Sequence, residues 1–82
     1  MMQLTIITPD QMVFQGEVTE ATFPGANGSF QVLKNHAAIV SALAKGNVSY
    51  TTKEGLKSHV IEGGVVEVND NKIVLLAEKV IG

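Results

Sequence analysis

The stretch "NVSYTTKEGLKSHVI", residues 47–61, shows most clearly how this chain folds. Apolar and polar side chains alternate on both sides of "KEG", which is the period-2 pattern of half-buried β-strands. We expect Val48 and Tyr50 to face a core and residues 53–55 to form a turn. The returning strand is predicted to place three side chains on one face: Leu56, Ser58 and Val60. The stretch therefore predicts an antiparallel hairpin.

The same alternation continues outward in both directions. "QLTIIT" places Leu4 and Ile6 on one face, and "SFQVL" does the same for Phe30 and Val32. "KIVLLA", residues 72–77, is apolar on both faces, which is typical of a central strand. Between these segments, glycine, proline and asparagine mark the turns.

Two segments depart from simple alternation. The inward phase slips near Thr19 and Glu20, which suggests a β-bulge there. "AAIVSALA", residues 37–44, fits either a short strand or a single helical turn, because alanine favours helix. With eight to ten short strands at regular spacing, the sequence predicts an all-β fold, an antiparallel β-sandwich or barrel. We expect one domain over residues 1–82.

Composition excludes several classes of protein. The chain has 82 residues and no cysteine, so disulfides, thiolate metal sites and thiol catalysis are excluded. All six positive residues are lysine and the net charge is -2, so nucleic-acid binding is not expected. No apolar run approaches the roughly 20 residues that cross a bilayer. The start "MMQLTIITPD" has no basic segment typical of a signal peptide, so we expect membrane contact only through a partner.

Motifs for chemistry are missing. "PGANG" and "EGGV" lack the glycine spacing of phosphate-binding loops, so no nucleotide and no cofactor are expected. His36 and His59 stand far apart with no ligand spacing around them, so no metal site is expected. His59, which alternates with Lys57, is expected to point to water. A small hydrolytic or ligand-binding β-domain would need a clustered polar pocket, and the sequence shows neither that nor catalytic residues.

Lys72 offers an alternative of another class. It follows the turn "NDN" in an all-β domain of about the size of lipoyl and biotinyl carrier domains, which present a modified lysine at a hairpin tip. The methionine-lysine context of those carriers is missing. A plain hairpin with a solvated lysine is the favoured interpretation.

The least charged stretch indicates where a partner would bind. Residues 21–44 carry one formal charge, Lys34, although several polar residues lie among them. Neutral polar groups tolerate partial burial better than charges do, and interface centres are depleted of charge. Part of this stretch must form core, and the rest predicts a partner surface on which His36 is a neutral or switchable hydrogen-bonding group.

Four segments in order resemble the N-terminal domain of the epsilon subunit of F-type ATP synthase, which is called delta in mitochondria. They are "ITPDQMVFQGEV" (7–18), the glycines and proline of "PGANG" (24–28), "QVLKNHAAIVSALAKG" (31–46) and "GGVVEVNDNKIVLLA" (63–77). The resemblance covers nearly the whole chain. It departs from the family pattern at Ser29, where an acidic residue is frequent, at "KNH" in place of a "PGH" tripeptide, and at Ala38 in place of proline.

The end of the chain is a further departure. The sequence stops at Gly82, where many members of this family continue into a pair of C-terminal helices that inhibit ATP hydrolysis. Either the organism makes a short form or the chain was shortened, and both interpretations stay open.

The resemblance implies a ten-stranded flattened sandwich in a non-catalytic subunit at the foot of the rotating central stalk. It implies a peripheral location at the cytoplasmic face of the bacterial inner membrane, with the gamma subunit and the polar loops of the c-ring as partners. The implied gamma-facing residues are Thr8, His36 and Val40. The implied c-ring-facing residues are those of the loop: Ala26, Asn27, Gly28, Ser29 and Gln31.

Overall fold

The computed structural model describes residues 1–82 and contains nine strands and no helix. The all-β prediction is therefore confirmed, with nine strands where about ten were expected. No segment has the long apolar helix that would be needed to cross a membrane. The strands are β1 (Met2–Thr8), β2 (Gln11–Val18), β3 (Glu20–Phe23), β4 (Phe30–Leu33), β5 (Ile39–Leu43), β6 (Gly46–Thr52), β7 (Gly55–Ile61), β8 (Gly64–Asn69) and β9 (Lys72–Ala77).

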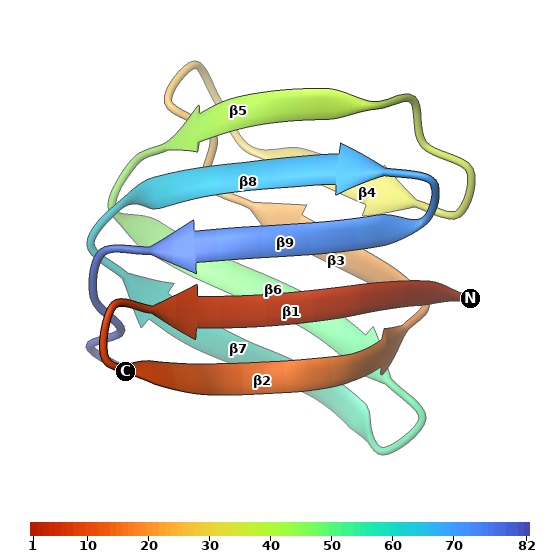
Figure 1. Cartoon of the computed structure of the whole chain (residues 1–82), viewed down its shortest axis with the longest axis horizontal. Coiled ribbons are helices and arrows are strands. Elements are labelled where there is room, and N and C mark those ends of the chain that lie inside the picture. Colours follow the sequence, from red (N-terminus) through yellow and green to blue (C-terminus); the bar gives the residue numbers. More distant parts are fainter.

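The strands form two packed sheets (Figure 1). The five-stranded sheet has the order β2-β1-β9-β8-β5, and the four-stranded sheet behind it has the order β4-β3-β6-β7. The Cα atoms span 27 × 26 × 19 Å, so the sandwich is flattened. All neighbouring strands are antiparallel except β1 and β9, which pair in parallel. This one parallel pair, which the sequence did not predict, joins the first strand to the last.

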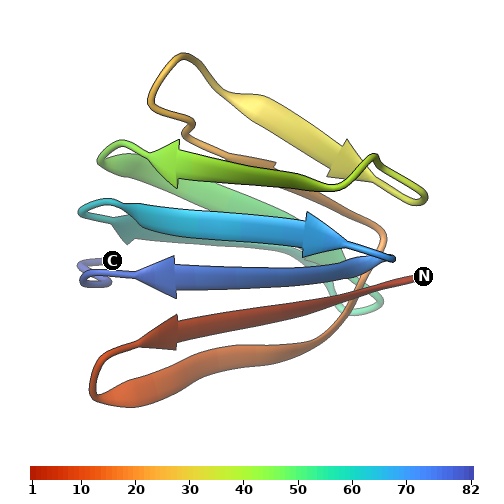
Figure 2. The ribbon, with the colours of Figure 1, turned by 45° about the horizontal axis from the view of Figure 1, so that its top comes forward.

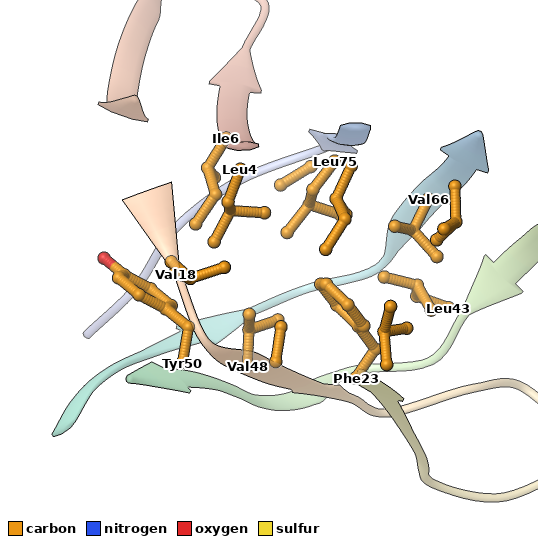
Figure 3. Packing of buried hydrophobic residues seen from close by; sticks show 14 of the residues in the cluster. Leu4, Ile6, Val18, Phe23, Leu43, Val48, Tyr50, Val66 and Leu75 are labelled. Atoms are coloured by element: carbon orange, nitrogen blue, oxygen red, sulfur yellow. The ribbon is translucent and has the colours of Figure 1, made fainter. Parts of the chain in front are cut away.

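The core lies between the sheets, where alternate residues of each strand point inward. In Figure 3, Leu4, Ile6 and Leu75 extend from the five-stranded sheet towards Val48 and Phe23 of the other sheet. Strict alternation in β1 and β9 buries every second side chain, as the period of a strand requires. The predicted inward residues Leu4, Ile6, Val48 and Tyr50 are all buried.

"KIVLLA" is β9, and it occupies the centre of the five-stranded sheet as predicted. Residues 39–43 form β5, so the strand interpretation of "AAIVSALA" is confirmed over the helical turn. β5 is an edge strand, and the main chain of the β3–β4 loop covers one end of that edge. The Ala26 amide donates to the Ala42 carbonyl at 3.0 Å, and the Ala44 amide donates to the Pro24 carbonyl at 2.8 Å.

The predicted bulge near Thr19 and Glu20 was wrong. Val18 ends β2 in the five-stranded sheet, and Glu20 begins β3 in the four-stranded sheet. The slip in phase therefore marks the point at which the chain crosses from one sheet to the other. The register of β1 against β2 does shift elsewhere, between Ile6 and Ile7, where Val13 of β2 is the extra residue.

The hairpin of β6 and β7 has a shorter turn than predicted. Thr52 pairs with Gly55, so only Lys53 and Glu54 lie between the strands. A change of one residue in the turn moves every side chain of a strand to the other face. Leu56 therefore lies on the outer face and is 72% exposed. Ser58 and Val60, which were predicted to share its face, lie on the outer face with it.

The shorter turn also places His59 on the inward side of β7, opposite Val48. The prediction that His59 points to water was therefore wrong. Its Nε2 lies 2.8 Å from the hydroxyl of the buried Tyr50.

Candidate partner-binding surfaces

The outer face of the five-stranded sheet carries a row of apolar side chains that crosses all five strands. Its members are adjacent in the sheet register and all point away from the core: Met12, Ile7, Leu76, Val65 and Ala42, on β2, β1, β9, β8 and β5. A second row beside it includes Val74 of β9 and Val40 of β5, separated by Glu67. We call these seven apolar residues the apolar band.

The apolar band is open to solvent. Met12, Val40, Val65 and Leu76 are 55%, 70%, 42% and 54% exposed, and they are half of the large apolar residues that the whole surface exposes. Single exposed apolar residues need no explanation, but a contiguous group of them marks an interaction site. Glu67 is the one formal charge in the two rows, so a partner could cover this face while stripping water from few charges.

A shallow hollow of about 360 Å³ lies beside the apolar band, where β1 and β9 end. Ile7 and Leu76 of the band form one side, and Thr8, Pro9 and Ala77 complete it. Such a hollow beside a flat apolar face can accept one large side chain from a partner, which is how interface anchors are seated.

The outer face of the four-stranded sheet differs. Its central positions carry small hydroxyl side chains, Thr22, Ser49 and Ser58, which are paired across β3, β6 and β7. Apolar residues are present only towards the ends of that face, at Leu33, Leu56 and Val60. The two faces of the sandwich are thus chemically distinct, and the five-stranded face is the stronger candidate for a docking surface.

Thr8, one of the residues implied to face the gamma subunit, contributes little surface. It is 6% exposed at the end of β1, and its hydroxyl donates to the Asp10 carboxylate at 2.8 Å. This bond stabilises the turn at Pro9 and Asp10. Thr8 therefore shapes the rim of the hollow and does not present a free hydroxyl.

The structure does not bring Thr8 and His36 together. Thr8 ends β1, whereas His36 follows β4 at the opposite end of the sandwich, near the β8–β9 turn (Figure 1). Val40 lies on the edge strand β5, on the outer face and in register with Glu67. His36 is half-buried, and its Nδ1 lies 2.7 Å from the Ala37 carbonyl, which requires a proton on Nδ1. In the neutral ring, Nε2 is then free to accept a hydrogen bond from a partner.

The loop implied to face the c-ring forms a compact exposed projection beyond β5 (Figure 2). The Gly28 amide donates to the Gly25 carbonyl at 3.0 Å, and Gly28 has φ 126°, a conformation that favours glycine. A Cβ on Gly25 would lie 2.5 Å from the Gly28 carbonyl oxygen, so the turn needs glycine there too. Gln31 is exposed on β4 next to this loop.

The least charged stretch of the sequence, residues 21–44, lies along one side of the sandwich and is called the neutral stretch below. Residues 21–44 form β3, β4 and β5 with their two loops, and β4 and β5 are the edge strands of their sheets on the same side of the sandwich (Figure 2). The loop of residues 26–31, His36 and Val40 therefore all lie along one edge of the molecule.

Sequence reasoning missed most of the apolar band. Met12, Ile7, Val65 and Leu76 were not singled out, although "KIVLLA" and "VVEV" carried a signal in their apolar residues at outward positions. An apolar second face was interpreted as burial within a larger core. In the structure it is solvent-exposed surface.

Lys72 does not occupy a hairpin tip. Asp70 and Asn71 form the β8–β9 turn, and Lys72 pairs with Asn69 as the first residue of β9. The carrier hypothesis needs a lysine at the tip, so the geometry does not favour it. No group of three His, Cys, Asp or Glu side chains is placed to hold a metal ion.

The polar cluster with shifted pKa values is structural. Burial raises the pKa of Tyr50, and burial together with the nearby Lys57 charge lowers the pKa of His59. Phe14 packs on Tyr50 with ring centroids 4.6 Å apart, and the His59 ring stacks on Tyr50 with centroids 5.7 Å apart. The three rings close the edge between β2 and β7, and no candidate nucleophile accompanies them.

These features define a class of protein: a small β-sandwich whose distinctive surfaces suit contact with other proteins. Comparison with known proteins specifies the family. The family model for the beta-sandwich domain of the ATP synthase delta/epsilon chain matches residues 1–82. The chain belongs to this family. Its members are a non-catalytic subunit of ATP synthase, which agrees with the expectation that the chain is not an enzyme.

The relatives agree with this assignment. The chain is 43% identical to the ATP synthase epsilon chain of Chlorobium limicola, over 95% of this chain and 90% of the relative. It is 35% identical to that of Leptospira borgpetersenii, over 94% of this chain and 61% of the relative.

Two solved structures share the fold. A chain of the Euglena gracilis mitochondrial ATP synthase, in a structure of OSCP, F1 and c-ring, has a TM-score of 0.90 and 26% identity, and the match covers 98% of this chain and 52% of that one. A chain in a structure of the central stalk and c-ring of the Tetrahymena thermophila mitochondrial ATP synthase has a TM-score of 0.83 and 18% identity. The match covers 98% of this chain and 65% of that one.

Proposed function

We propose that this chain joins the gamma subunit to the c-ring in the central stalk of a bacterial ATP synthase, with residues 1–82 acting as one β-sandwich domain. Its place is peripheral, at the cytoplasmic face of the inner membrane. The bacterial relatives named ATP synthase epsilon chain support the assignment. So does the Euglena structural neighbour, which was solved in an assembly with F1 and the c-ring. Neither a nucleotide nor a cofactor has a part in this function.

The apolar band carries the proposal. A rotating joint must transmit torque without slipping, so its surfaces must be rigid and buried over a broad area. The outer face of the five-stranded sheet is broad, and it is rigid because each strand beneath the band is fixed by its neighbours and by the core. A partner that docks on it would bury the band. We infer that the gamma subunit covers this face, with Val40 near one edge and the hollow beside Thr8 near the other.

His36 extends this contact at the far end of the sheet. Its free Nε2 can accept one hydrogen bond from gamma, and His36 belongs to the stretch of residues 21–44 whose one formal charge is Lys34. Replacing His36 by Asp would place an unpaired carboxylate in that contact, at a cost on the order of a few kcal/mol. We expect gamma binding to weaken about tenfold or more while the domain still folds, and unchanged affinity would remove His36 from the interface.

The loop of residues 26–31, which ends at Gln31, is the proposed contact with the c-ring. The loop projects at the β4–β5 edge, and its backbone shape is held by the turn at Gly25 and Gly28. Its side chains carry no charge, so the contact depends on neutral hydrogen bonds and on packing. One rigid body then presents two different surfaces to two partners, as a coupling element requires.

Site-specific photo-cross-linking tests both contacts in the assembled enzyme. A photoreactive amino acid replaces Val40, Ser29 or, as a matched control, Leu56 on the outer face of the other sheet. We expect Val40 to cross-link to gamma, Ser29 to the c-ring subunit and Leu56 to neither. If Leu56 captured gamma and Val40 did not, the docking face would be the opposite one, and the proposal would be wrong.

A further inference from the structure

One asparagine connects three separate parts of the fold. Asn71 lies in the β8–β9 turn, and its carbonyl accepts the Gln3 amide of β1 at 2.9 Å. Its side-chain Oδ1 accepts the Asn35 amide at 2.7 Å, and its Nδ2 donates to the Asn35 Oδ1 at 3.2 Å. The partners are 36 residues apart in sequence. We call this reciprocal pair of bonds the Asn35–Asn71 clasp.

The residue type matters at both positions. Asn35 and Asn71 have φ of 65° and 61°, and asparagine is the non-glycine residue that tolerates this left-handed conformation best. An amide also accepts and donates at once, whereas a carboxylate only accepts and would oppose the Asn35 Oδ1. Asp70 has φ of 53° in the same turn, yet its side chain makes no hydrogen bond. Turn geometry therefore explains the backbone of Asn71 but not its side-chain bonds.

The clasp holds the segment that carries His36. Residues 34–38 join β4 to β5 and belong to no strand. Within this segment, the His36 amide bonds back to the Leu33 carbonyl at 3.0 Å and the His36 ring bonds to Ala37. The two bonds of the clasp are the hydrogen bonds that connect the segment to another part of the fold. Without them the segment would be attached mainly through its two ends.

We propose that Asn71 is a positioning residue for partner binding, because the Asn35–Asn71 clasp fixes the His36 segment at the end of the five-stranded sheet. The inference rests on the proposed contact of this segment with gamma. A segment that is already ordered binds more tightly than one that must be ordered on contact. Asn71 would thus influence affinity without touching the partner.

Glycine variants separate the side chain from the turn. Asn71→Gly keeps the left-handed backbone and removes both clasp bonds. Asp70→Gly makes the matched change at the neighbouring turn residue, whose side chain makes no bond. The first readout is hydrogen exchange of the Asn35 amide in the free chain. We expect Asn71→Gly to speed it about tenfold or more, as loss of a local protecting bond should, and Asp70→Gly to leave it unchanged.

The second readout is affinity for the gamma subunit. We expect Asn71→Gly to weaken binding by roughly five- to tenfold, through the cost of ordering a loop on binding, and Asp70→Gly to have no effect. In an Asn35→Gly background, Asn71→Gly should weaken binding less, because the two residues share bonds. Faster exchange with unchanged affinity would overturn the positioning role.

A third arm keeps the inference separate from the proposed function. If His36→Asp leaves gamma affinity unchanged, the proposed contact at His36 is wrong, and the positioning role falls with it. If His36→Asp weakens binding and Asn71→Gly does not, the contact stands and only the positioning role is wrong. Unfolding in urea accompanies each variant, and loss of binding counts only for variants that are folded.

Discussion

The hydroxyl of Tyr50 belongs to a core residue, and its one hydrogen-bond partner is His59. Tyr50 is 1% exposed, and its hydroxyl lies 2.8 Å from the His59 Nε2. The hydroxyl donates to the ring when the proton of the neutral imidazole is on Nδ1. Buried polar groups without a partner are costly, so the two residues should behave as a unit.

Removing His59 should therefore cost more than removing both partners. His59→Leu leaves the Tyr50 hydroxyl unsatisfied, and we expect the free energy of unfolding to fall by about 1–3 kcal/mol. Adding Tyr50→Phe to His59→Leu should recover a large part of that loss. Urea denaturation of the two single variants and the double variant measures the coupling. Additive losses would show that the bond between the two residues contributes nothing.

The lowered pKa of His59 predicts a pH dependence of stability. Burial and Lys57 disfavour the charged ring in the folded state, so the unfolded chain binds the proton more readily. The stability that neutral His59 contributes is then fully present above about pH 6.5, the pKa of histidine in the unfolded chain. It is lost as the pH falls through the lower pKa that His59 has in the folded state. His59→Gln should flatten this fall in urea unfolding between about pH 7.5 and pH 5.5. His36 is present in both proteins, and parallel curves would contradict the prediction.

At the scale of elements, alternation in the sequence predicted strands well and sheet membership poorly. β1, β4 and β6 lie where their period-2 patterns indicated, with the expected residues inward, and β9 is the central strand that its apolar run indicated. The slip after Val18 has the same sequence appearance whether a strand bulges or changes sheet, because both reverse the inward phase. Only the pairing of Ala21 with Tyr50 in the other sheet distinguishes the two.

β7 and β9 show two further reasons for error. In β7, counting three turn residues instead of two reversed the assignment of His59, since one residue inverts a strand. In β9, the apolar outward residues Val74 and Leu76 were consistent with full burial, and alternation cannot tell burial by the fold from burial by a partner. The apolar band was hidden from the sequence for this reason.

The β3–β4 loop gives a prediction at this scale. Ser29 is exposed, so its substitution should not change unfolding. If the c-ring loop is basic, Ser29→Glu should preserve or slightly raise coupled ATP synthesis, and Ser29→Lys should lower it. Both changes should be modest, because exposed ion pairs contribute about 0–1 kcal/mol. ATP synthesis and proton pumping in rebuilt membranes provide the measurement. Ser58→Lys, exposed on the four-stranded sheet, is the control, and equal coupling in all variants would exclude the loop from the ring contact.

At the scale of the whole molecule, the neutral stretch and the apolar band share one edge of the sandwich. β5 belongs to both, since Val40 and Ala42 are band residues on a strand of the neutral stretch. Residues 21–44 could be selected from the sequence because charge is scarce there. The rest of the band could not, because its members come from four other strands and become neighbours only through sheet pairing.

The central claim is that the outer face of the five-stranded sheet binds the gamma subunit, and two leucines test it directly. Leu76 lies in the apolar band, and Leu56 is equally available on the outer face of the other sheet, at 54% and 72% exposure. Replacing either by Glu should leave folding intact, because neither is in the core.

Titration calorimetry of each variant with gamma is the decisive measurement. We predict that Leu76→Glu weakens binding about tenfold or more, which corresponds to about 1.4 kcal/mol, and that Leu56→Glu matches the parent chain. Weaker binding of Leu56→Glu with full binding of Leu76→Glu would contradict the account.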